Sequence, residues 1–228
     1  MNLDAENGAR LTGRQPVGPS TGVALVLHGG RVTSREPVTG RQLAVVRVAL
    51  LAESVHRRVV EHGIAVWSLR FAVRGWNGAE ASPVPDVAWA LDQIRRHTGL
   101  PVVLVGHSMG GRAALRAAGD PSVRGVIGLA PWLPENEPVQ QLAGRSVLIA
   151  HGSADRITDP AASARYVEKI RPTALSAQFR EVAGENHALL RRPGVWSRLV
   201  AQGVRDGLGG PGGPDRREGP AAPGRSPW

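Results

Sequence analysis

Residues 106–110 carry the residue types and spacing that most directly suggest chemistry. They read Gly-His-Ser-Met-Gly and follow an apolar run at 102–105. A serine between two glycines at the end of a buried strand is how a nucleophilic hydroxyl becomes exposed on a tight strand-to-helix turn. The glycines are needed because the strand and the helix pass closely, so that a Cβ at either position would collide. The pattern predicts Ser108 as a nucleophile, and an ordinary helix N-cap is the alternative.

A serine hydroxyl needs a base and an orienting acid before it can attack a carbonyl group. Asp155 follows a probable buried strand at 146–150, and His187 follows another at 177–182. The loops after parallel strands lie on one edge of a sheet, so both side chains should meet Ser108 there. We expect His187 to accept and return the proton, and Asp155 to orient the imidazole and stabilise its cation.

Each partner has an alternative interpretation. Asp159 competes with Asp155 for the acid role, but it precedes Pro160 and an alanine-rich segment. Asp before a first-turn proline is typical of a helix N-cap, which explains Asp159 structurally. His187 could instead be a surface histidine, although its place after the last strand favours the role of a base.

An oxyanion hole requires two backbone N–H groups aimed at the developing negative charge. Met109 follows the nucleophile at a helix N-terminus, where amides are unpaired and the helix dipole favours an anion. The second donor should come from the loop after the strand at 23–27, where two glycines allow close approach. We predict Gly30 N–H as this donor, with Arg31 as the alternative.

Other polar and aromatic residues lie on the same predicted edge. His28, His107 and His151 should orient loops or touch substrate, and they do not form a spaced set of metal ligands. We therefore expect neither a metal nor a cofactor. Loop packing is the alternative interpretation of the candidate substrate contacts, which are Arg31, Trp76, His107 and Trp132.

Strand-like and helix-like segments alternate along the chain, which predicts a doubly wound, mostly parallel sheet. We count about six strands, at 23–27, 64–69, 102–105, 125–129, 146–150 and 177–182. Helices are expected over 42–62, from Pro85, over 109–118 and after Pro160. The loop at 31–40 should overhang the active edge, and the loop at 71–83 should form a pocket wall.

Composition fits a single domain that is not exported. The chain has 228 residues, 42% of them hydrophobic, and no cysteine, which removes disulfides and thiolate chemistry. Its net charge of +9 comes from scattered arginines without a basic run, so we expect no nucleic-acid partner. Residues 1–21 lack an apolar leader and no stretch reaches the length of a membrane span, which predicts a cytoplasmic protein without a membrane partner.

Three regions follow from these patterns. Residues 1–21 should be a flexible N-terminal segment, and residues 22–205 should form the folded domain. Residues 206–228 are rich in Gly, Pro and Arg, cannot bury apolar surface, and are expected to be a disordered tail.

The chain resembles the small members of the α/β-hydrolase superfamily, close to dienelactone hydrolases and short-chain carboxylesterases. The resemblance depends on HGG at 28–30, GHSMGG at 106–111, HGxxD at 151–155 and GxNH at 184–187. It covers residues 22–205 and implies an α/β-hydrolase fold. The family's sheet usually has about eight strands, two more than we count. The short connection between Leu129 and Val147 implies that the helical lid of lipases is missing.

Together, the residues and the resemblance predict a serine hydrolase that cleaves an ester or thioester of a small acyl substrate through an acyl-serine intermediate. An acyltransferase or thioesterase in a biosynthetic pathway, or a cofactor-free peroxidase, would use the same residues. A non-catalytic binding module on this fold is the alternative from a different class. The sequence does not indicate the acyl group, the leaving group or the oligomeric state.

Overall fold

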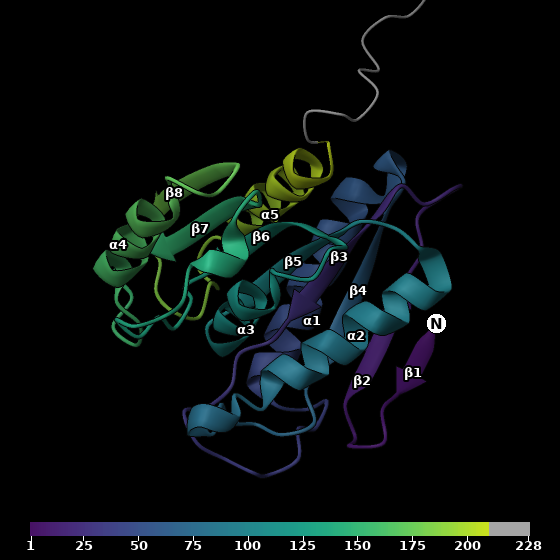
Figure 1. Cartoon of the computed structure of the whole chain (residues 1–228), viewed down its shortest axis with the longest axis horizontal. Helices are drawn as coiled ribbons and strands as arrows, with labels where there is room; N and C mark the ends of the chain where they lie inside the picture. Colours follow the sequence, from purple (N-terminus) through teal and green to yellow (C-terminus); the bar gives the residue numbers. More distant parts are fainter. Residues whose placement is uncertain (210–228) are drawn as a thin grey trace, which may run out of the picture.

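A computed structural model of the chain describes residues 1–209, and its centre is one sheet of eight strands in the order β1-β2-β4-β3-β5-β6-β7-β8 (Figure 1). Strands β3 to β8 run parallel, whereas β1 and β2 are antiparallel to their neighbours. The strands are β1 (Asn2–Asp4), β2 (Arg10–Arg14), β3 (Gly22–Leu27), β4 (Ile64–Arg70), β5 (Val102–His107), β6 (Val123–Leu129), β7 (Ser146–Gly152) and β8 (Ser176–Val182).

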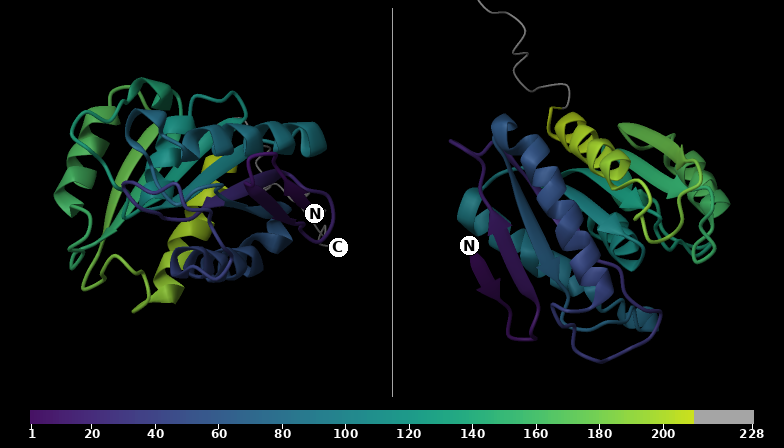
Figure 2. Two further views of the ribbon diagram at one scale, coloured as in Figure 1. Left: turned by 90° about the horizontal axis from the view of Figure 1, so that it is seen from below. Right: turned by 180° about the vertical axis from the view of Figure 1, so that it is seen from behind.

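Helices cover both faces of this sheet (Figure 2). Helices α1 and α5 lie side by side on one face, and α2, α3 and α4 cover the other. Their bounds are α1 (Leu43–Val59), α2 (Pro83–Thr98), α3 (Met109–Ala117), α4 (Pro160–Ile170) and α5 (Pro193–Leu208), with short 3-10 turns η1 (Val60–His62), η2 (Gly78–Glu80) and η3 (Gln140–Leu142).

The central strands are apolar because both of their faces are covered. In β3, Val23 and Leu25 face the core under α2 and α3, whereas Ala24 and Val26 face the core under α1 and α5. Every residue of β3 and β5 is buried. Strands buried on both faces are continuous apolar runs, which is the pattern that predicted them. All six predicted strands are present, and they are the six parallel ones.

The two additional strands lie at residues 2–14, which corrects the expectation of a flexible N-terminal segment. Strand β2 pairs along β4, and β1 pairs with β2 at the edge of the sheet. The C-terminal boundary of the folded domain, predicted at residue 205, also moves, because α5 continues to Leu208. The predicted disordered tail otherwise falls on residues 210–228, which lie outside the described residues.

Two loops at the carboxyl edge are joined to each other. An isolated bridge links Arg31 to Gly75, and another links Pro37 to Val73. The loop after β3 is thus held against the loop after β4. Between β6 and β7 the chain forms only the short turn η3, so no helical lid is inserted there.

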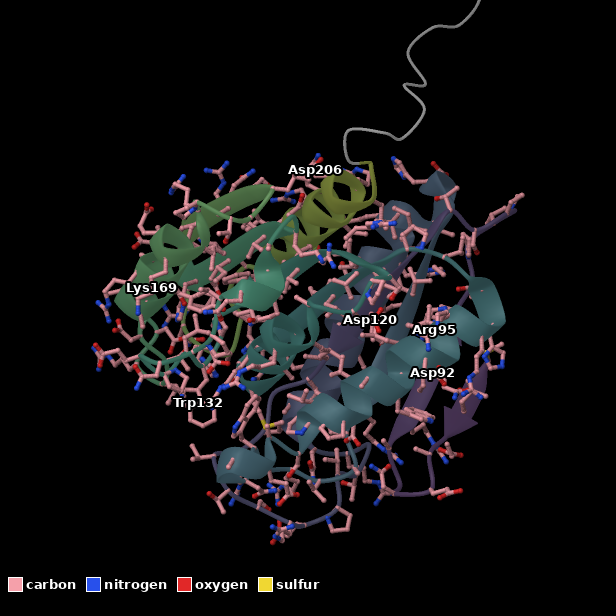
Figure 3. All side chains as sticks on the ribbon, in the orientation of Figure 1. Asp92, Arg95, Asp120, Trp132, Lys169 and Asp206 are labelled. Carbon is pink, nitrogen blue, oxygen red and sulfur yellow. The ribbon has the colours of Figure 1, made fainter. Side chains whose placement is uncertain are left out.

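An ion-pair cluster joins the helices of one face, away from this edge. Arg95 of α2 pairs with Asp92 at 2.5 Å and lies 3.8 Å from Asp120, which follows α3; all three are labelled in Figure 3. Within residues 1–209, no helix is both long and apolar enough to span a bilayer.

Candidate active site

Ser108 occupies the sharp turn between β5 and α3. Its backbone has φ 54° and ψ −119°, a region that costs a non-glycine residue about 1–3 kcal/mol. A Cβ at Gly106 would overlap the backbone of Gly110, and a Cβ at Gly110 would overlap the carbonyl oxygens of Leu27 and His28. The turn therefore needs glycine on both sides, for the steric reason that the sequence suggested. The Ser108 side chain makes no helix-capping hydrogen bond.

The three side chains predicted to act together form one hydrogen-bonded relay. His187 Nε2 lies 3.0 Å from Ser108 Oγ, and His187 Nδ1 lies 2.8 Å from Asp155 Oδ2. They come from the loops after β8, β5 and β7, which the parallel sheet brings to one edge. With the proton of a neutral imidazole on Nδ1, Nε2 can accept the serine proton.

Asp155 is held as a carboxylate by donors on both of its oxygens. Oδ1 accepts the backbone N–H groups of Ile157 at 2.8 Å and Thr158 at 3.1 Å, and Oδ2 accepts the Thr158 hydroxyl at 2.9 Å. Burial alone would raise the pKa of Asp155, but the bonds from Ile157 N–H, from His187 and from Thr158 lower it below its ordinary value. Asp159 instead caps α4 by accepting Ala161 N–H at 2.8 Å, as its proline neighbour predicted.

A second imidazole contacts the same carboxylate. His151 is fully buried, with Nε2 3.1 Å from Asp155 Oδ2 and Nδ1 2.8 Å from the Ser163 hydroxyl. Burial lowers the pKa of His151, so the neutral ring donates from Nε2 and accepts at Nδ1. The sequence placed His151 at this edge but did not reveal this contact. Its spacing of four residues from Asp155 in HGxxD is the signal that could have suggested it.

His107 packs against the His187 ring and holds the loop that carries it. It is 2% exposed, its Nε2–H donates to the backbone oxygen of His187 at 2.9 Å, and the two rings have centroids 4.8 Å apart. Burial, together with the nearby His187, lowers the pKa of His107 to about 3, so its ring stays neutral. Our prediction that His107 binds substrate is therefore corrected, because the ring is covered and its donor is used within the protein.

His28 fixes the peptide that precedes Gly30. Its Nε2 accepts Phe71 N–H at 3.1 Å, and its Nδ1–H donates to the Gly29 carbonyl at 2.7 Å. Burial lowers the pKa of His28 to about 4, which preserves this neutral tautomer. In a trans peptide the C=O and the N–H point in opposite directions. Holding Gly29 C=O therefore also sets the direction of Gly30 N–H.

The structure distinguishes between the two predicted oxyanion donors of this loop. Arg31 N–H donates to the Arg74 carbonyl at 2.8 Å, so it is not available, and that alternative is corrected. Within residues 1–209, the N–H groups of Gly30 and Met109 donate to no protein acceptor. A Cβ at Gly30 would overlap Arg74 O and the Met109 side chain, which explains the glycine. The Arg31 side chain is exposed, so it stays a predicted substrate contact.

The two tryptophans differ from each other. Trp76 is 2% exposed and lies 3.9 Å from the guanidinium of Arg112, so our prediction that it contacts substrate is corrected. Trp132 is partly exposed at the margin of the molecule (Figure 3), and Arg112 lies 4.6 Å from its ring. Arg112 also pairs with buried Glu137 at 2.7 Å. This cation–π cluster joins α3 to the loops after β4 and β6, and Trp132 stays a predicted substrate contact.

An open cavity of about 420 Å³ lies beside His187. Its walls come from the loops after β7 and β8, and they are Ala154, Arg156, Ile157, Asn186, His187, Ala188 and Arg191. Ile157 is 75% exposed, so the cavity has an apolar rim close to His187. A small molecule has room here without any rearrangement of the sheet.

Comparisons with known proteins agree with this arrangement. Residues 73–146, about a third of the chain, match the family model described as serine aminopeptidase, S33. No curated protein sequence matches the chain significantly.

Solved structures match over most of the length. An alpha-beta serine hydrolase homologue from Coxiella burnetii has a TM-score of 0.68 at 17% identity, covering 90% of this chain and 96% of that one. Est1E from Butyrivibrio proteoclasticus has a TM-score of 0.68 at 15% identity, with coverages of 92% and 99%. A serine hydrolase without a lid from Xanthomonas campestris has a TM-score of 0.64 at 21% identity, with coverages of 90% and 92%.

The sheet order, the serine turn and these similarities lead to one conclusion. The chain has the α/β-hydrolase fold, with no helical lid between β6 and β7.

Proposed function

We propose that this protein is a serine hydrolase that cleaves carboxylic esters or thioesters through an acyl-serine intermediate. The observation that carries the proposal is the continuous relay from Ser108 Oγ to His187 Nε2 at 3.0 Å and from His187 Nδ1 to Asp155 Oδ2 at 2.8 Å. A hydroxyl, an imidazole and a carboxylate in this order provide a nucleophile, a general base and its orienting group.

In the first half-reaction Ser108 Oγ attacks the carbonyl carbon while its proton moves to His187 Nε2. The carbonyl electron pair moves onto oxygen, where Gly30 N–H and Met109 N–H can donate to it. One such donor is commonly worth about 3 kcal/mol in the transition state. The tetrahedral intermediate then collapses, and the leaving alkoxide or thiolate takes the proton from His187.

In the second half-reaction water replaces the leaving group. His187 removes a proton from the water, the resulting hydroxide attacks the acyl carbon, and the Ser108 oxygen leaves with the proton returned by His187. Asp155 stays ionised throughout and stabilises the imidazolium, a role that suits its lowered pKa. No cofactor takes part in this sequence of steps.

The shape of the site favours soluble acyl groups of small size. The cavity beside His187 is open, and the segment between β6 and β7 forms no helical cover. Among the structural relatives, Est1E has been solved with ferulic acid bound, at a TM-score of 0.64 and 15% identity over 89% of this chain and 96% of that one. This supports a small carboxylic acid as the acyl product.

The test is turnover of p-nitrophenyl acetate, butyrate and octanoate and of short acyl thioesters by the full chain and by Ser108→Ala. We expect measurable release of p-nitrophenol or thiol from wild type and loss of at least about 10³-fold in the variant. Unchanged turnover in Ser108→Ala would remove the proposal. Ser153→Ala is a matched control, because this exposed serine follows β7 and its hydroxyl only accepts the N–H of Gly184 at 2.9 Å.

Covalent labelling with a fluorophosphonate tests the nucleophile without assuming a substrate. We expect one adduct on the peptide that carries Ser108 and no adduct in Ser108→Ala. Wild-type protein that is folded but does not label would favour the non-catalytic binding module instead. Product analysis with added alcohols would distinguish hydrolysis from acyl transfer.

A further inference from the structure

A second cavity lies behind the loop that carries His187, between α1 and the start of α5. Its volume is about 220 Å³ and its walls are predominantly apolar. The lining residues are Arg47, Val48, Leu50, Leu51, Ser54, Leu189, Leu190, Pro193 and Trp196. None of them lines the cavity beside His187, so the two spaces are separate.

Two side chains provide the polar groups of this cavity, and one of them is a cation. The Trp196 indole N–H is already used by Glu185 Oε2 at 3.1 Å, so the ring presents carbon to the cavity. That leaves the hydroxyl of Ser54 and the guanidinium of Arg47 as the polar groups of the lining.

Arg47 is a cation without an acid partner among residues 1–209. Its Nε is buried and has no hydrogen-bond partner, and burial lowers the pKa of its guanidinium. Glu53 is the acid of α1, and it pairs with Arg14 at 2.8 Å and with Arg57 at 3.0 Å. A partly buried guanidinium that lacks a carboxylate partner gains from an anion that brings its own apolar body.

The walls continue into exposed apolar surface. Leu50 is 64% exposed and Leu190 is 58% exposed, and both line the cavity. Leu189 lies between this opening and His187 with φ 58°, an uncommon backbone conformation for leucine. Strained backbone of this kind is often found in functional loops. The apolar surface around the opening can cover the tail of a ligand whose head reaches Arg47.

We propose that this cavity is a binding site for an aliphatic monocarboxylate, with the carboxylate on Arg47 and the hydrocarbon tail between α1 and residues 189–196. The volume sets the size of the tail. A methylene group takes about the same volume as a water molecule in the liquid, about 30 Å³. A cavity of about 220 Å³ therefore holds about seven such groups, which matches a chain of six to eight carbons. A longer chain would extend past Leu50 and Leu190 into solvent.

Isothermal titration of sodium octanoate into the full chain tests the site directly. We expect saturable binding to wild type and a dissociation constant about tenfold to a hundredfold larger in Arg47→Gln, because a charge-assisted hydrogen bond is lost. Leu51→Trp should also weaken binding, because the larger side chain fills the cavity. Absence of saturable octanoate binding to folded wild-type protein would overturn the proposal.

Matched controls separate the charge from general effects. Arg57→Gln removes an arginine from the same helix but outside this cavity, and it should bind octanoate as wild type does. Octanol carries a similar tail without the charge and should bind at least about tenfold more weakly than octanoate. Equal affinity of octanol and octanoate, or of Arg47→Gln and wild type, would contradict the proposal.

The position of the ligand decides between this cavity and the catalytic edge. An octanoate analogue with a photoreactive diazirine on its tail should label peptides that contain residues 47–54 or 189–196. Labelling confined to residues 106–112 or 154–157 would place the acid at the candidate active site and overturn this inference. None of these measurements requires that the protein hydrolyse esters, so the two proposals fail independently.

Discussion

The turn at Ser108 and the loop that carries His187 meet at one hydrogen bond but are held by different interactions. The turn is fixed by backbone sterics, since Gly106 and Gly110 each face main-chain atoms at distances that no Cβ allows. The His187 loop is fixed by side chains: His107 donates to its carbonyl, and Asp155 accepts from its ring. The position of Ser108 therefore depends on non-bonded backbone contacts, whereas the position of His187 depends on side-chain hydrogen bonds.

This difference predicts two classes of defect. Damage to the serine turn should appear as lost folding, because the strand and the helix cannot meet without it. Damage to the supports of the base should appear as lost turnover in a protein that remains folded. Unfolding experiments measure defects of the Ser108 turn, and kinetic experiments measure defects in the contacts that hold His187. The two regions can therefore be tested separately.

The largest effect is expected from the carboxylate that orients the base. Asp155→Asn keeps the shape of the side chain but cannot hold the Nδ1–H tautomer of His187. The kcat for a short p-nitrophenyl ester should therefore fall about 10³–10⁴-fold. Asp159→Asn is the matched control at the helix cap, and it should keep kcat within about twofold, because asparagine is also a favourable cap. Equal losses in both variants would contradict the assignment of the acid.

Gly110→Ala tests the steric side of the comparison. Its new Cβ would overlap the carbonyl oxygens of Leu27 and His28, so the unfolding free energy should fall by about 2–4 kcal/mol or the chain should fail to fold. Gly119→Ala is the control, because its Cβ would meet only Gln141 Cβ at 3.5 Å, an ordinary contact. Urea unfolding followed by circular dichroism measures both. A Gly110→Ala protein as stable as wild type would contradict the steric argument.

His107→Leu tests the side-chain support of the base. The variant keeps the volume but loses the donor to the His187 carbonyl, so kcat should fall about tenfold to thirtyfold with a small change in KM. His107→Gln can offer an amide N–H and should recover part of the loss. Far-ultraviolet circular dichroism checks that both variants keep the fold. A kcat of His107→Leu equal to that of wild type would show that the loop does not need this bond.

Acid should weaken the protein through its buried neutral histidines. His28 and His107 have pKa values of about 4 and about 3 in the fold, against 6.5 ordinarily, so the unfolded chain binds more protons than the folded one below pH 6.5. The unfolding free energy should therefore fall as pH drops from 6.5 towards 5, with a limit of about 1.4 kcal/mol per pH unit for each histidine. Urea midpoints at pH 7, 6 and 5 measure the slope, and His107→Leu should flatten it. A slope unchanged in that variant would contradict the role of His107.

The sequence predicted the parallel part of the sheet and the relay for a shared physical reason. Strands buried on both faces must be apolar throughout, so their ends could be located, and the residues after those ends fall on one edge. Ser108, Asp155 and His187 each follow such a strand directly. Their convergence therefore depended only on the order of the strands and not on details of packing.

The N-terminal hairpin and the directions of two side chains could not be predicted from apolar runs. The hairpin of β1 and β2 was missed because β1 has only three residues, and because three of the five residues of β2 are exposed and its one buried residue is Leu11. Such short, polar strands become strands only because β4 offers them an unpaired edge. Likewise, the sequence placed His107 and Trp76 at the active edge but could not show that both rings turn inward, because that direction depends on neighbours such as Arg112.

The N-terminal hairpin also has a consequence for the solubility of the fold. Strand β4 is apolar and almost entirely buried, and without β2 along it the outer row of its amide and carbonyl groups would be open. Open edges of apolar strands recruit strands from other molecules, which leads to aggregation. Strand β2 satisfies that row in the antiparallel sense and presents Arg10, Thr12 and Arg14 to solvent. These first residues therefore protect the edge of β4 from pairing with a strand of another molecule.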